Sequence, residues 1–382
     1  MHIAFLTPEY PHSTCNASGG LGTSLKNLGR SLVQHGIRVS VVVYGQDKKY
    51  NFKENGIEFY LIAQKKYKIG GWYLYRKYLQ NFLNELSKKE NIDLIEAADW
   101  TGITAFMKLN VPLVVRMHGS DTYFCALEKR KQKWKNKWFE EKALKNADHL
   151  ISVSEFTGLK TLELFNLKKN FKVISNGVNL KEFPIEDQNI LENQIFYFGS
   201  LIRKKGVLEL ASIFNLLVEI RQDVQLLIAG KDVKDEMEKT STLALFQSKL
   251  TKKAKQNFKY VGEVEYTKIK FYIETAAVVV LPSFAEAFPM TWLEAMAMNK
   301  ALVTSNIGWA KEIMIDGETG YMVNPEDHEL YAEKLLILLG DKTLRNAMGR
   351  RSRRRILENF STEIIAPENI NFYNSVLKRN SN

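Results

Sequence analysis

The amino-acid sequence predicts an α/β protein made of two doubly wound domains, each a parallel sheet covered by helices. Apolar, β-branched runs of strand length alternate with amphipathic helical runs, as repeated βαβ units require. This alternation stops at the polar stretch 179–193 and then starts again. A length of 382 residues also suits two domains, since a typical domain has roughly 100–200 residues.

The first half of the chain opens with a short apolar run, residues 2–7, which is predicted to be a strand. An amphipathic helix follows at residues 21–36, with leucines along one stripe and Gly36 at its end. Residues 38–44, RVSVVVY, are rich in β-branched residues, which is typical of a buried parallel strand. The remaining predicted elements are strands at 57–62, 93–97, 112–117, 149–153 and 171–174, and helices at 73–89 and 128–146.

The second half repeats the same alternation from residue 194 onward. Its predicted elements are strands at 194–198, 224–229, 258–261, 277–281, 301–304 and 320–323, and helices at 207–221, 267–275 and 289–298. Helices are expected after Asp327, and the last of them, at 360–377, is expected to cross back to the first domain. The predicted domains are therefore 1–175 and 176–360, with 361–382 a C-terminal helix that packs toward the N-terminal domain.

Composition indicates which kinds of binding partner and which cellular compartment to expect. The net charge of +11 and the sequence pI near 9.3 predict anionic partners, namely nucleic acid, anionic lipid or phosphorylated small molecules. The two cysteines, Cys15 and Cys125, have neither a disulfide framework nor metal-ligand spacing. The start of the chain has no export signal, and no apolar run is long enough to span a membrane. A cytoplasmic location is expected.

A candidate ligand site lies where the predicted strand 277–281 ends and a new helix begins. Ligands of open α/β sheets bind at such carboxyl ends of strands. Pro289 is expected in the first turn of the helix, where unpaired N–H groups near Met290 and Thr291 suit a diphosphate. Glu294, in the second turn, has the chemistry to accept hydrogen bonds from ribose hydroxyls, and Glu286, in the preceding loop, from hydroxyls of a sugar.

Several segments in this order resemble retaining glycosyltransferases of the GT-B fold, family 4. Residues 283–294, SFAEAFPMTWLE, resemble the Glu-x7-Glu element of that family. Further resemblances are FGSLIRKKG at 198–206, NGVN at 176–179, TSNIGWAKEI at 304–313 and DGETG at 316–320. The resemblance covers essentially the whole chain and is densest between residues 176 and 325.

This resemblance implies the GT-B fold, two Rossmann-like domains that face a central cleft. It also implies a hexosyltransferase that retains anomeric configuration and uses a nucleoside-diphosphate sugar, with UDP favoured over GDP. No metal or other cofactor is expected. The implied acceptor is a glycan or a lipid-linked glycan, and cell-surface polysaccharide synthesis is the expected process.

The resemblance also assigns roles to individual residues. Lys205 matches the lysine that neutralises the donor diphosphate. Ser200 stands where the family usually has an arginine, so Arg203 is the expected substitute. The catalytic residues are expected to be His118 and Glu286. The expected donor-binding residues are Gly20, Gly22, Gly199, Arg203, Lys205, Ala287, Phe288, Met290, Thr291 and Glu294.

The first half contributes a glycine-rich loop and a histidine. Residues 19–22, GGLG, precede the first long helix, where backbone N–H groups favour an anion. An NAD-dependent oxidoreductase is the alternative, but G-G-x-G is not the dinucleotide spacing G-x-G-x-x-G, and the glycines come too far after the strand. His118 follows a buried strand, and the family places a histidine here near the donor sugar.

A basic, aromatic segment at 128–145 carries many lysines, with Trp134 and Trp138 expected on one helix face. Such a helix can lie on an anionic membrane; alternatively, its tryptophans pack in the core and its lysines are solvated. The arginines at 350–355 are interpreted mainly as a solvated helix. A basic nucleic-acid-binding module is the other class that fits the charge, but no base-reading motif supports it. Acceptor recognition is assigned to loops 48–55 and 65–71.

Overall fold

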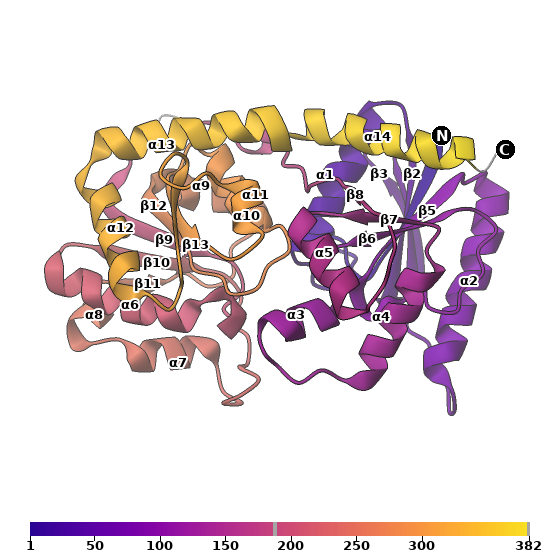
Figure 1. The fold of residues 1–382 in the computed structure, drawn as a ribbon, viewed down its shortest axis with the longest axis horizontal. Helices are drawn as coiled ribbons and strands as arrows, with labels where there is room; N and C mark the ends of the chain where they lie inside the picture. Colours follow the sequence, from indigo (N-terminus) through magenta and orange to yellow (C-terminus); the bar gives the residue numbers. More distant parts are fainter. Residues whose placement is uncertain (186–188, 380–382) are drawn as a thin grey trace. The chain divides into compact units, whose positions relative to one another are not determined.

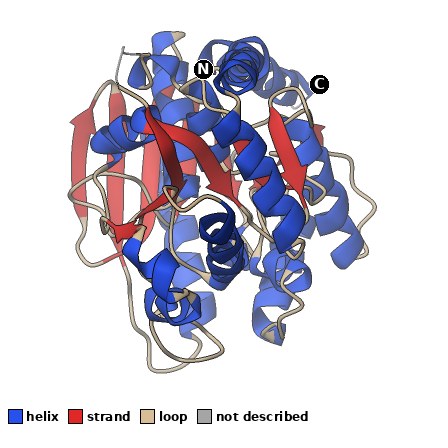
Figure 2. Cartoon of the chain, turned by 90° about the vertical axis from the view of Figure 1, so that its left-hand side faces the viewer, coloured by secondary structure: helices blue, strands red, loops and turns tan. Residues whose placement is uncertain are grey.

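The computed structural model describes residues 1–185 and 189–379 and divides into two compact units. Unit 1 comprises Met1–Gly177 with Phe360–Asn382, and unit 2 comprises Val178–Asn359. In each unit the strands lie between helices (Figures 1 and 2), which confirms the α/β class. Residues 186–188 of the predicted polar stretch and residues 380–382 of the predicted C-terminal segment lie outside the described residues.

Unit 1 is built on a sheet in the order β3-β4-β2-β1-β5-β6-β7-β8. Adjacent strands are parallel except for β3 and β4. The central strands are buried on both faces, as their β-branched runs require. The strands are β1 (His2–Thr7), β2 (Arg38–Gln46), β3 (Tyr50–Glu54), β4 (Ile57–Ala63), β5 (Leu94–Ala98), β6 (Leu113–Met117), β7 (His149–Ser152) and β8 (Lys172–Val173).

The strand β3 corrects the prediction of a loop at 48–55. It pairs antiparallel with β4 and places Phe52 opposite Phe59, whose rings stack with centroids 4.6 Å apart. Asn51 points to solvent on the other face. An edge strand of five residues with no fully buried side chain gives little hydrophobic periodicity, so the sequence pattern did not reveal it.

The helices of unit 1 are α1 (Gly20–Gln34), α2 (Gly71–Glu90), α3 (Asp121–Leu127), α4 (Trp134–Asn146), α5 (Glu155–Leu164) and α14 (Thr362–Arg379), with a 3₁₀ turn η1 (Trp100–Gly102). Helix α14 packs in this unit although it comes last in the sequence (Figure 1). The Ser31 hydroxyl on α1 donates to the Thr362 carbonyl at 3.2 Å, and Ile365 and Tyr373 of α14 join the buried core.

The predicted basic helix 128–146 is wrong in its first six residues. The chain leaves α3 at Glu128, and Lys129 adopts a left-handed conformation with φ of 52°. The Arg130 N–H then donates to the Cys125 carbonyl at 2.8 Å, which closes the end of α3. A second helix, α4, starts only at Trp134.

Unit 2 is built on a parallel sheet in the order β11-β10-β9-β12-β13-β14. Its strands are β9 (Leu191–Phe198), β10 (Gln225–Ala229), β11 (Phe258–Tyr260), β12 (Ala276–Leu281), β13 (Leu302–Ser305) and β14 (Gly320–Val323). Its helices are α6 (Val207–Ile220), α7 (Thr242–Lys249), α8 (Lys252–Gln256), α9 (Tyr266–Thr275), α10 (Met290–Ala297), α11 (Ala310–Ile313), α12 (His328–Gly340) and α13 (Lys342–Arg355). Shorter turns are η2 (Leu180–Glu182), η3 (Arg203–Lys205) and the π-helical η4 (Ile356–Phe360).

Two arginines on α13 do not form the solvated surface that the sequence predicted. Arg353 donates to the carbonyls of Phe183 and Ala297. Arg355 donates to the carbonyls of Ile313 and Glu312, at 2.5 and 2.8 Å. These donors satisfy carbonyls at the ends of α10 and α11, where a helix leaves such groups unpaired. Among the described residues, no helix is both long and apolar enough to cross a bilayer.

Candidate functional site

In unit 2, strand β12 leads into the loop that carries Glu286, and α10 begins directly after it. Pro289 occupies the residue before the first turn of α10 and not the first turn itself, a small correction to the prediction. The predicted donor-binding residues Ala287, Phe288 and Met290 are buried around this start, and Thr291 is half-buried. The loop and the helix start therefore lie at the carboxyl edge of the sheet, where open α/β sheets bind ligands.

Strand β9 ends beside the same helix start. Gly199 has a φ of 134°, and a Cβ on it would lie 3.9 Å from Thr291 Cγ2. A Cβ on Gly230, at the end of β10, would lie 1.9 Å from the Gly199 carbonyl oxygen. Glycine at both positions therefore lets the ends of β9 and β10 approach each other closely beside α10.

Lys205 forms an ion pair with Glu286, with Nζ and Oε1 2.5 Å apart. The turn η3 that carries Lys205 is fastened to the Glu286 loop, because the Phe284 N–H donates to the Lys204 carbonyl at 2.8 Å. Gly206 follows with a φ of 69°, and a Cβ there would lie only 1.9 Å from the Pro282 carbonyl oxygen. The backbone thus holds the two predicted charged residues against each other.

Arg203 forms an ion pair with a different carboxylate, that of Asp235. Its guanidinium donates to both carboxylate oxygens of Asp235, at 3.0 and 3.1 Å. This hydrogen bonding from Arg203 lowers the pKa of Asp235. Asp235 is buried and also accepts from the N–H groups of Met237 and Glu238. A cation held in this way is less available to a diphosphate than Lys205, and nothing in the local sequence pointed to Asp235.

Glu294 is buried on α10, and the Tyr266 hydroxyl donates to its Oε1 at 2.9 Å. Burial raises the pKa of Glu294 to about 7, although the Tyr266 hydrogen bond opposes that rise. Tyr266 lies at the start of α9 and its ring meets Phe183 edge-on, with centroids 6.1 Å apart. Nothing in the sequence pointed to Tyr266, because it contacts a residue 28 positions away along the chain and such a contact leaves no local pattern.

In unit 1, the glycine-rich loop 19–22 binds the carboxylate of Glu9. The N–H groups of Gly19 and Gly22 donate to Glu9 Oε1, at 2.9 and 2.8 Å. Gly20 opens helix α1, so Glu9 lies where the helix dipole favours a negative charge. The position that the sequence assigned to a bound anion is thus taken by a side chain of the same chain, one that the sequence analysis gave no such role.

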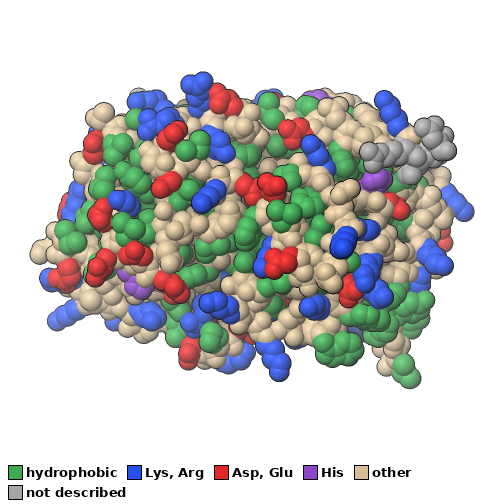
Figure 3. Space-filling view, in the orientation of Figure 1, with side chains coloured by type: hydrophobic (Ala, Val, Ile, Leu, Met, Phe, Trp, Pro, Cys, Tyr) green, Lys and Arg blue, Asp and Glu red, His purple; other side chains and the backbone are tan. Residues whose placement is uncertain are grey.

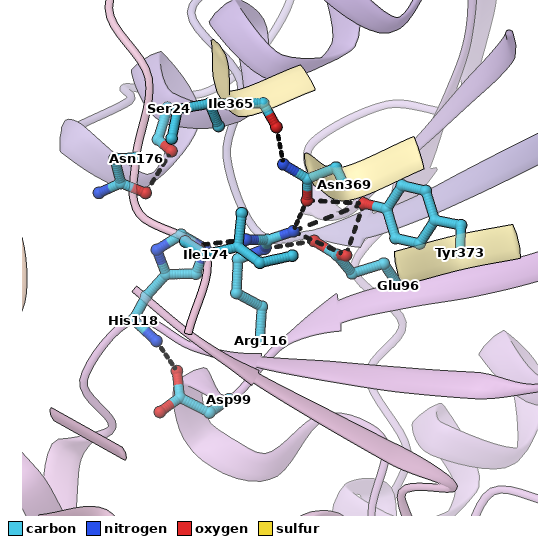
Figure 4. Close-up of polar contacts among 10 residues, drawn as sticks. All are labelled: Ser24, Glu96, Asp99, Arg116, His118, Ile174, Asn176, Ile365, Asn369 and Tyr373. Atoms are coloured by element: carbon cyan, nitrogen blue, oxygen red, sulfur yellow. Dashed lines mark hydrogen bonds and ion pairs between the residues drawn. The ribbon is translucent and has the colours of Figure 1, made fainter. Parts of the chain in front are cut away.

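His118 directly follows β6, at the carboxyl edge of the sheet of unit 1. Its N–H donates to Asp99 Oδ1 at 3.0 Å, which fixes the backbone between strand and loop (Figure 4). Burial and, to a smaller extent, the charge of Arg116 together lower the pKa of His118 to about 3. The imidazole is therefore neutral at physiological pH, a state in which it can both donate and accept a hydrogen bond.

A buried polar network lies next to His118 (Figure 4). Arg116 donates to both oxygens of Glu96, at 2.7 and 3.1 Å, and to Asn369 Oδ1 at 2.5 Å. The Tyr373 hydroxyl donates to Glu96 Oε2 at 2.8 Å. Because Asn369 and Tyr373 belong to α14, the network attaches the last helix to the strands that carry the site.

A small cavity borders this network and reaches Thr7, Ser24, His118 and Asn176. Ser24 donates to Asn176 Oδ1 at 2.7 Å on its wall (Figure 4). The volume of about 30 Å³ holds a water molecule but not a sugar ring.

Asp99 provides a pH-dependent test of this part of unit 1. Burial raises its pKa to about 8, so the folded state binds a proton that the unfolded state has lost above about pH 4. Stability from this group is thus present at low pH and lost as pH rises toward 8. Asp99→Asn should therefore gain stability relative to the parent protein between pH 5 and 8, as measured by thermal unfolding. The control is Asp93→Asn, which replaces an exposed aspartate that also accepts a backbone N–H; an equal trend in both variants would contradict the prediction.

The described residues contain no group of three or more His, Cys, Asp or Glu side chains that could hold a metal ion. The polar groups of the candidate site are instead a lysine, carboxylates and helix N-termini. Such groups bind phosphates and sugar hydroxyls. Two α/β units that carry ligand-binding groups at the carboxyl edges of their parallel strands fit a sugar-nucleotide transferase of the GT-B fold.

Comparison with known families agrees with this class. The family model described as Glyco_transf_4, Glycosyltransferase Family 4, matches residues 18–182, and the model Glycosyl transferases group 1 matches residues 181–355. The chain belongs to the group 1, family 4 glycosyltransferases and is an enzyme of the hexosyltransferase type. The resemblance identified in the sequence is confirmed.

Individual relatives are distant. The capsular polysaccharide biosynthesis glycosyltransferase CapM of Staphylococcus aureus is 29% identical over 255 residues, and that match spans 63% of this chain and 64% of CapM. Sucrose-phosphate synthase from Thermosynechococcus elongatus superposes with a TM-score of 0.82 at 19% identity, covering 99% of each chain. HepE of Anabaena, solved in complex with UDP-glucose, superposes with a TM-score of 0.75 at 17% identity, covering 98% of this chain and all of that one. At these identities, the two structures show the shared GT-B fold.

Proposed function

We propose that this enzyme transfers a hexosyl group with retention of configuration from a UDP-sugar to a glycan or lipid-linked glycan in cell-surface polysaccharide synthesis. The observation that most supports the donor site is the arrangement of Lys205, Glu286 and Glu294 at one edge of the unit 2 sheet. The UDP-glucose complex of HepE supports UDP as the nucleotide, and the role of CapM in capsular polysaccharide biosynthesis supports the polysaccharide product.

Lys205 and the start of α10 hold the donor diphosphate in this proposal. Negative charge grows on the leaving diphosphate as the glycosidic bond breaks, and preorganised cations and helix N–H groups stabilise that charge. Gly199 and Thr291 lie at the same N-terminus of α10. Because no metal takes part in the proposed reaction, the protein itself supplies the positive charge.

Glu294 and Glu286 bind hydroxyl groups. Glu294 accepts from the ribose, for which its carboxylate must be ionised, and Glu286 accepts from the donor sugar once the diphosphate draws Lys205 away. His118 hydrogen-bonds the donor sugar as a neutral imidazole. The family resemblance adds that the acceptor attacks from the side of the leaving group, whose phosphate oxygen takes the acceptor proton.

The acceptor is proposed to lie with unit 1 and to reach the enzyme at a membrane surface, with the enzyme in the cytoplasm. The segment 128–145 is the predicted contact with anionic lipid. Gly20 and Gly22 bind an anion of donor or acceptor only after Glu9 has released the loop N–H groups.

Thermal unfolding in EDTA, with UDP, GDP, ADP, NAD and a panel of UDP- and GDP-sugars, tests the donor site. A selective rise of Tm with UDP compounds is expected, because a ligand that binds only the native state stabilises it. Product analysis by NMR then reports the anomeric configuration. Stabilisation by GDP compounds alone, or a requirement for added metal, would overturn those parts of the proposal.

Removal of the Tyr266 hydroxyl should make donor binding more dependent on pH. Without that hydrogen bond, the Glu294 carboxyl is expected to ionise only at a higher pH than the parent value of about 7. Tyr266→Phe should bind UDP about tenfold more weakly near pH 7 and recover toward pH 9, since a hydrogen bond to a charged group contributes roughly 1.5–3 kcal/mol. Calorimetry across this pH range measures the effect.

Two variants control this prediction. Tyr272→Phe changes another tyrosine of the same helix and should leave the pH profile unchanged. Glu294→Gln should bind weakly at every pH. A uniform loss of affinity in Tyr266→Phe, with no recovery at high pH, would assign Tyr266 a purely structural role.

A further inference from the structure

Unit 1 exposes a group of large apolar side chains at the starts of α2 and α4. Ile69 is 87% exposed and Trp134 is 71% exposed, and Trp72, Tyr73 and Leu74 are each exposed beside them in sequence or space. We call these five residues the aromatic face. Figure 3 shows hydrophobic side chains gathered at the lower right, over the lower ends of α2 and α4 in Figure 1. An exposed apolar patch on a folded protein marks a site of interaction.

The aromatic face rests on a rigid support. Trp72 meets Trp138 and Phe139, with ring centroids 5.8 and 5.2 Å apart, so the first turn of α2 packs against the second turn of α4. Phe106 lies 5.1 Å from Trp138 and is held at a φ of 64°, a strained conformation for a bulky residue. Below them, the buried Arg76 stacks on Phe139 at 4.1 Å. The exposed side chains of the aromatic face are therefore supported by a packed layer of Phe106, Trp138 and Phe139 beneath them.

The surroundings of the aromatic face are basic. Residues 64–74 and 129–138 contain no aspartate or glutamate. Their lysines are all exposed: Lys65, Lys66, Lys68, Lys129, Lys131, Lys133, Lys135 and Lys137. Among the ion pairs of the described residues, Arg130 is the one basic residue of these two segments that takes part. It pairs with Asp121 and Glu128. Apolar side chains ringed by lysines complement an anionic surface with an apolar interior.

The topology places this surface at the functional edge of unit 1. Helix α2 follows strand β4, so its start lies at the carboxyl edge of the parallel strands. Helix α4 precedes β7, so its end lies at the opposite edge and its start again at the carboxyl edge. The glycine loop and His118 occupy the same edge, which is where such sheets bind ligands.

We propose that the aromatic face inserts into the headgroup region of an anionic lipid bilayer, with the surrounding lysines on the lipid phosphates. Tryptophan and tyrosine favour this region because they combine an apolar ring with a polar atom, and lysines reach the surface along their apolar stems. Each lysine near an anionic membrane adds to the attraction. The inference rests on the proposed function only in that a lipid-linked acceptor would then meet unit 1 at its ligand-binding edge.

This surface differs from the segment 128–145 that the sequence indicated. Within that segment Trp134, Arg130 and most of the lysines are exposed, whereas Trp138 and Phe139 are partners of Trp72. The other half of the surface comes from residues 65–74, of which 65–71 were assigned to acceptor recognition. These residues lie more than fifty positions earlier in the chain.

Co-sedimentation of the full-length enzyme with phosphatidylcholine vesicles, with and without phosphatidylglycerol, tests the proposal. Binding is expected only to the phosphatidylglycerol vesicles and should weaken at high salt. The pair Ile69→Ser with Trp134→Ser and the pair Lys133→Gln with Lys135→Gln should each reduce vesicle affinity about tenfold. The matched controls are Ile220→Ser with Phe271→Ser and Lys252→Gln with Lys255→Gln, exposed residues of unit 2 that should change nothing.

Three outcomes would overturn the proposal: no binding of the parent enzyme, equal losses in test and control pairs, or tighter binding to an oligonucleotide that the same test pairs abolish. The last would identify a nucleic-acid surface. The stabilisation of each variant by UDP is measured in parallel. An unchanged UDP response with lost vesicle binding separates the membrane surface from the donor site, and failure of UDP to bind the parent enzyme would reject the proposed donor without affecting the vesicle result.

Discussion

Replacement of Lys205 by alanine is expected to lower the kcat of sugar transfer about 10²–10³-fold, the usual effect of removing one preorganised group that stabilises developing charge. Lys205 is the cation placed against Glu286 at the start of α10. Its removal also leaves the buried Glu286 without that partner, so a modest fall in Tm should accompany the loss of rate. Initial rates at saturating donor, with Tm measured on the same preparation, give both quantities.

Two neighbours provide the comparison. Lys204→Ala removes the same charge one residue away and should keep nearly full activity. Arg203→Ala should cost less than Lys205→Ala, because its guanidinium is bound by Asp235. A rate for Lys205→Ala within a few-fold of the parent, or a larger loss in Arg203→Ala, would move the phosphate-binding role away from Lys205.

The second large effect concerns the stability of unit 1. Arg116→Ala is expected to lower the free energy of unfolding by about 3–5 kcal/mol, since it leaves the buried carboxylate of Glu96 without its charge partner. The cost arises from the unpaired buried charge. Replacing both residues by apolar ones of similar size, Glu96→Leu with Arg116→Met, should therefore restore much of the loss.

Urea unfolding followed by tryptophan fluorescence measures these changes. Tyr373→Phe removes one hydrogen bond to Glu96 and keeps the ion pair, so it should cost about 1 kcal/mol. If Arg116→Ala proved no more harmful than Tyr373→Phe, the unpaired carboxylate of Glu96 would not be the main cost of the substitution.

The parts of the fold that the sequence predicted well are those in which burial imposes a pattern. The run at residues 38–44 became β2, and the apolar run before Glu286 became β12, because strands covered on both faces must be apolar throughout. The strand β3 and the end of α3 at Leu127 escaped prediction. They depend on the ring contacts of Phe52 and on the left-handed conformation of Lys129, which composition does not reveal.

The candidate site likewise contains residues that the sequence predicted and partners that it did not predict. Glu286 and Lys205 stand in motifs that the resemblance located, and the structure places them in contact. The partners that modify site residues escaped prediction: Asp235 on Arg203, Tyr266 on Glu294 and Glu9 on the glycine loop. Each is a tertiary contact between segments that the fold brings together, so only the three-dimensional structure shows it.

Both ends of the described chain belong to unit 1, and this affects how the protein is made. Translation delivers residues 1–177 first, but the network around Arg116 needs Asn369 and Tyr373 from α14. Unit 2 is one continuous stretch and has all of its strands before α14 leaves the ribosome. The domain synthesised first is thus the last to be completed, and until α14 docks, the Arg116–Glu96 pair lacks the polar partners that α14 supplies.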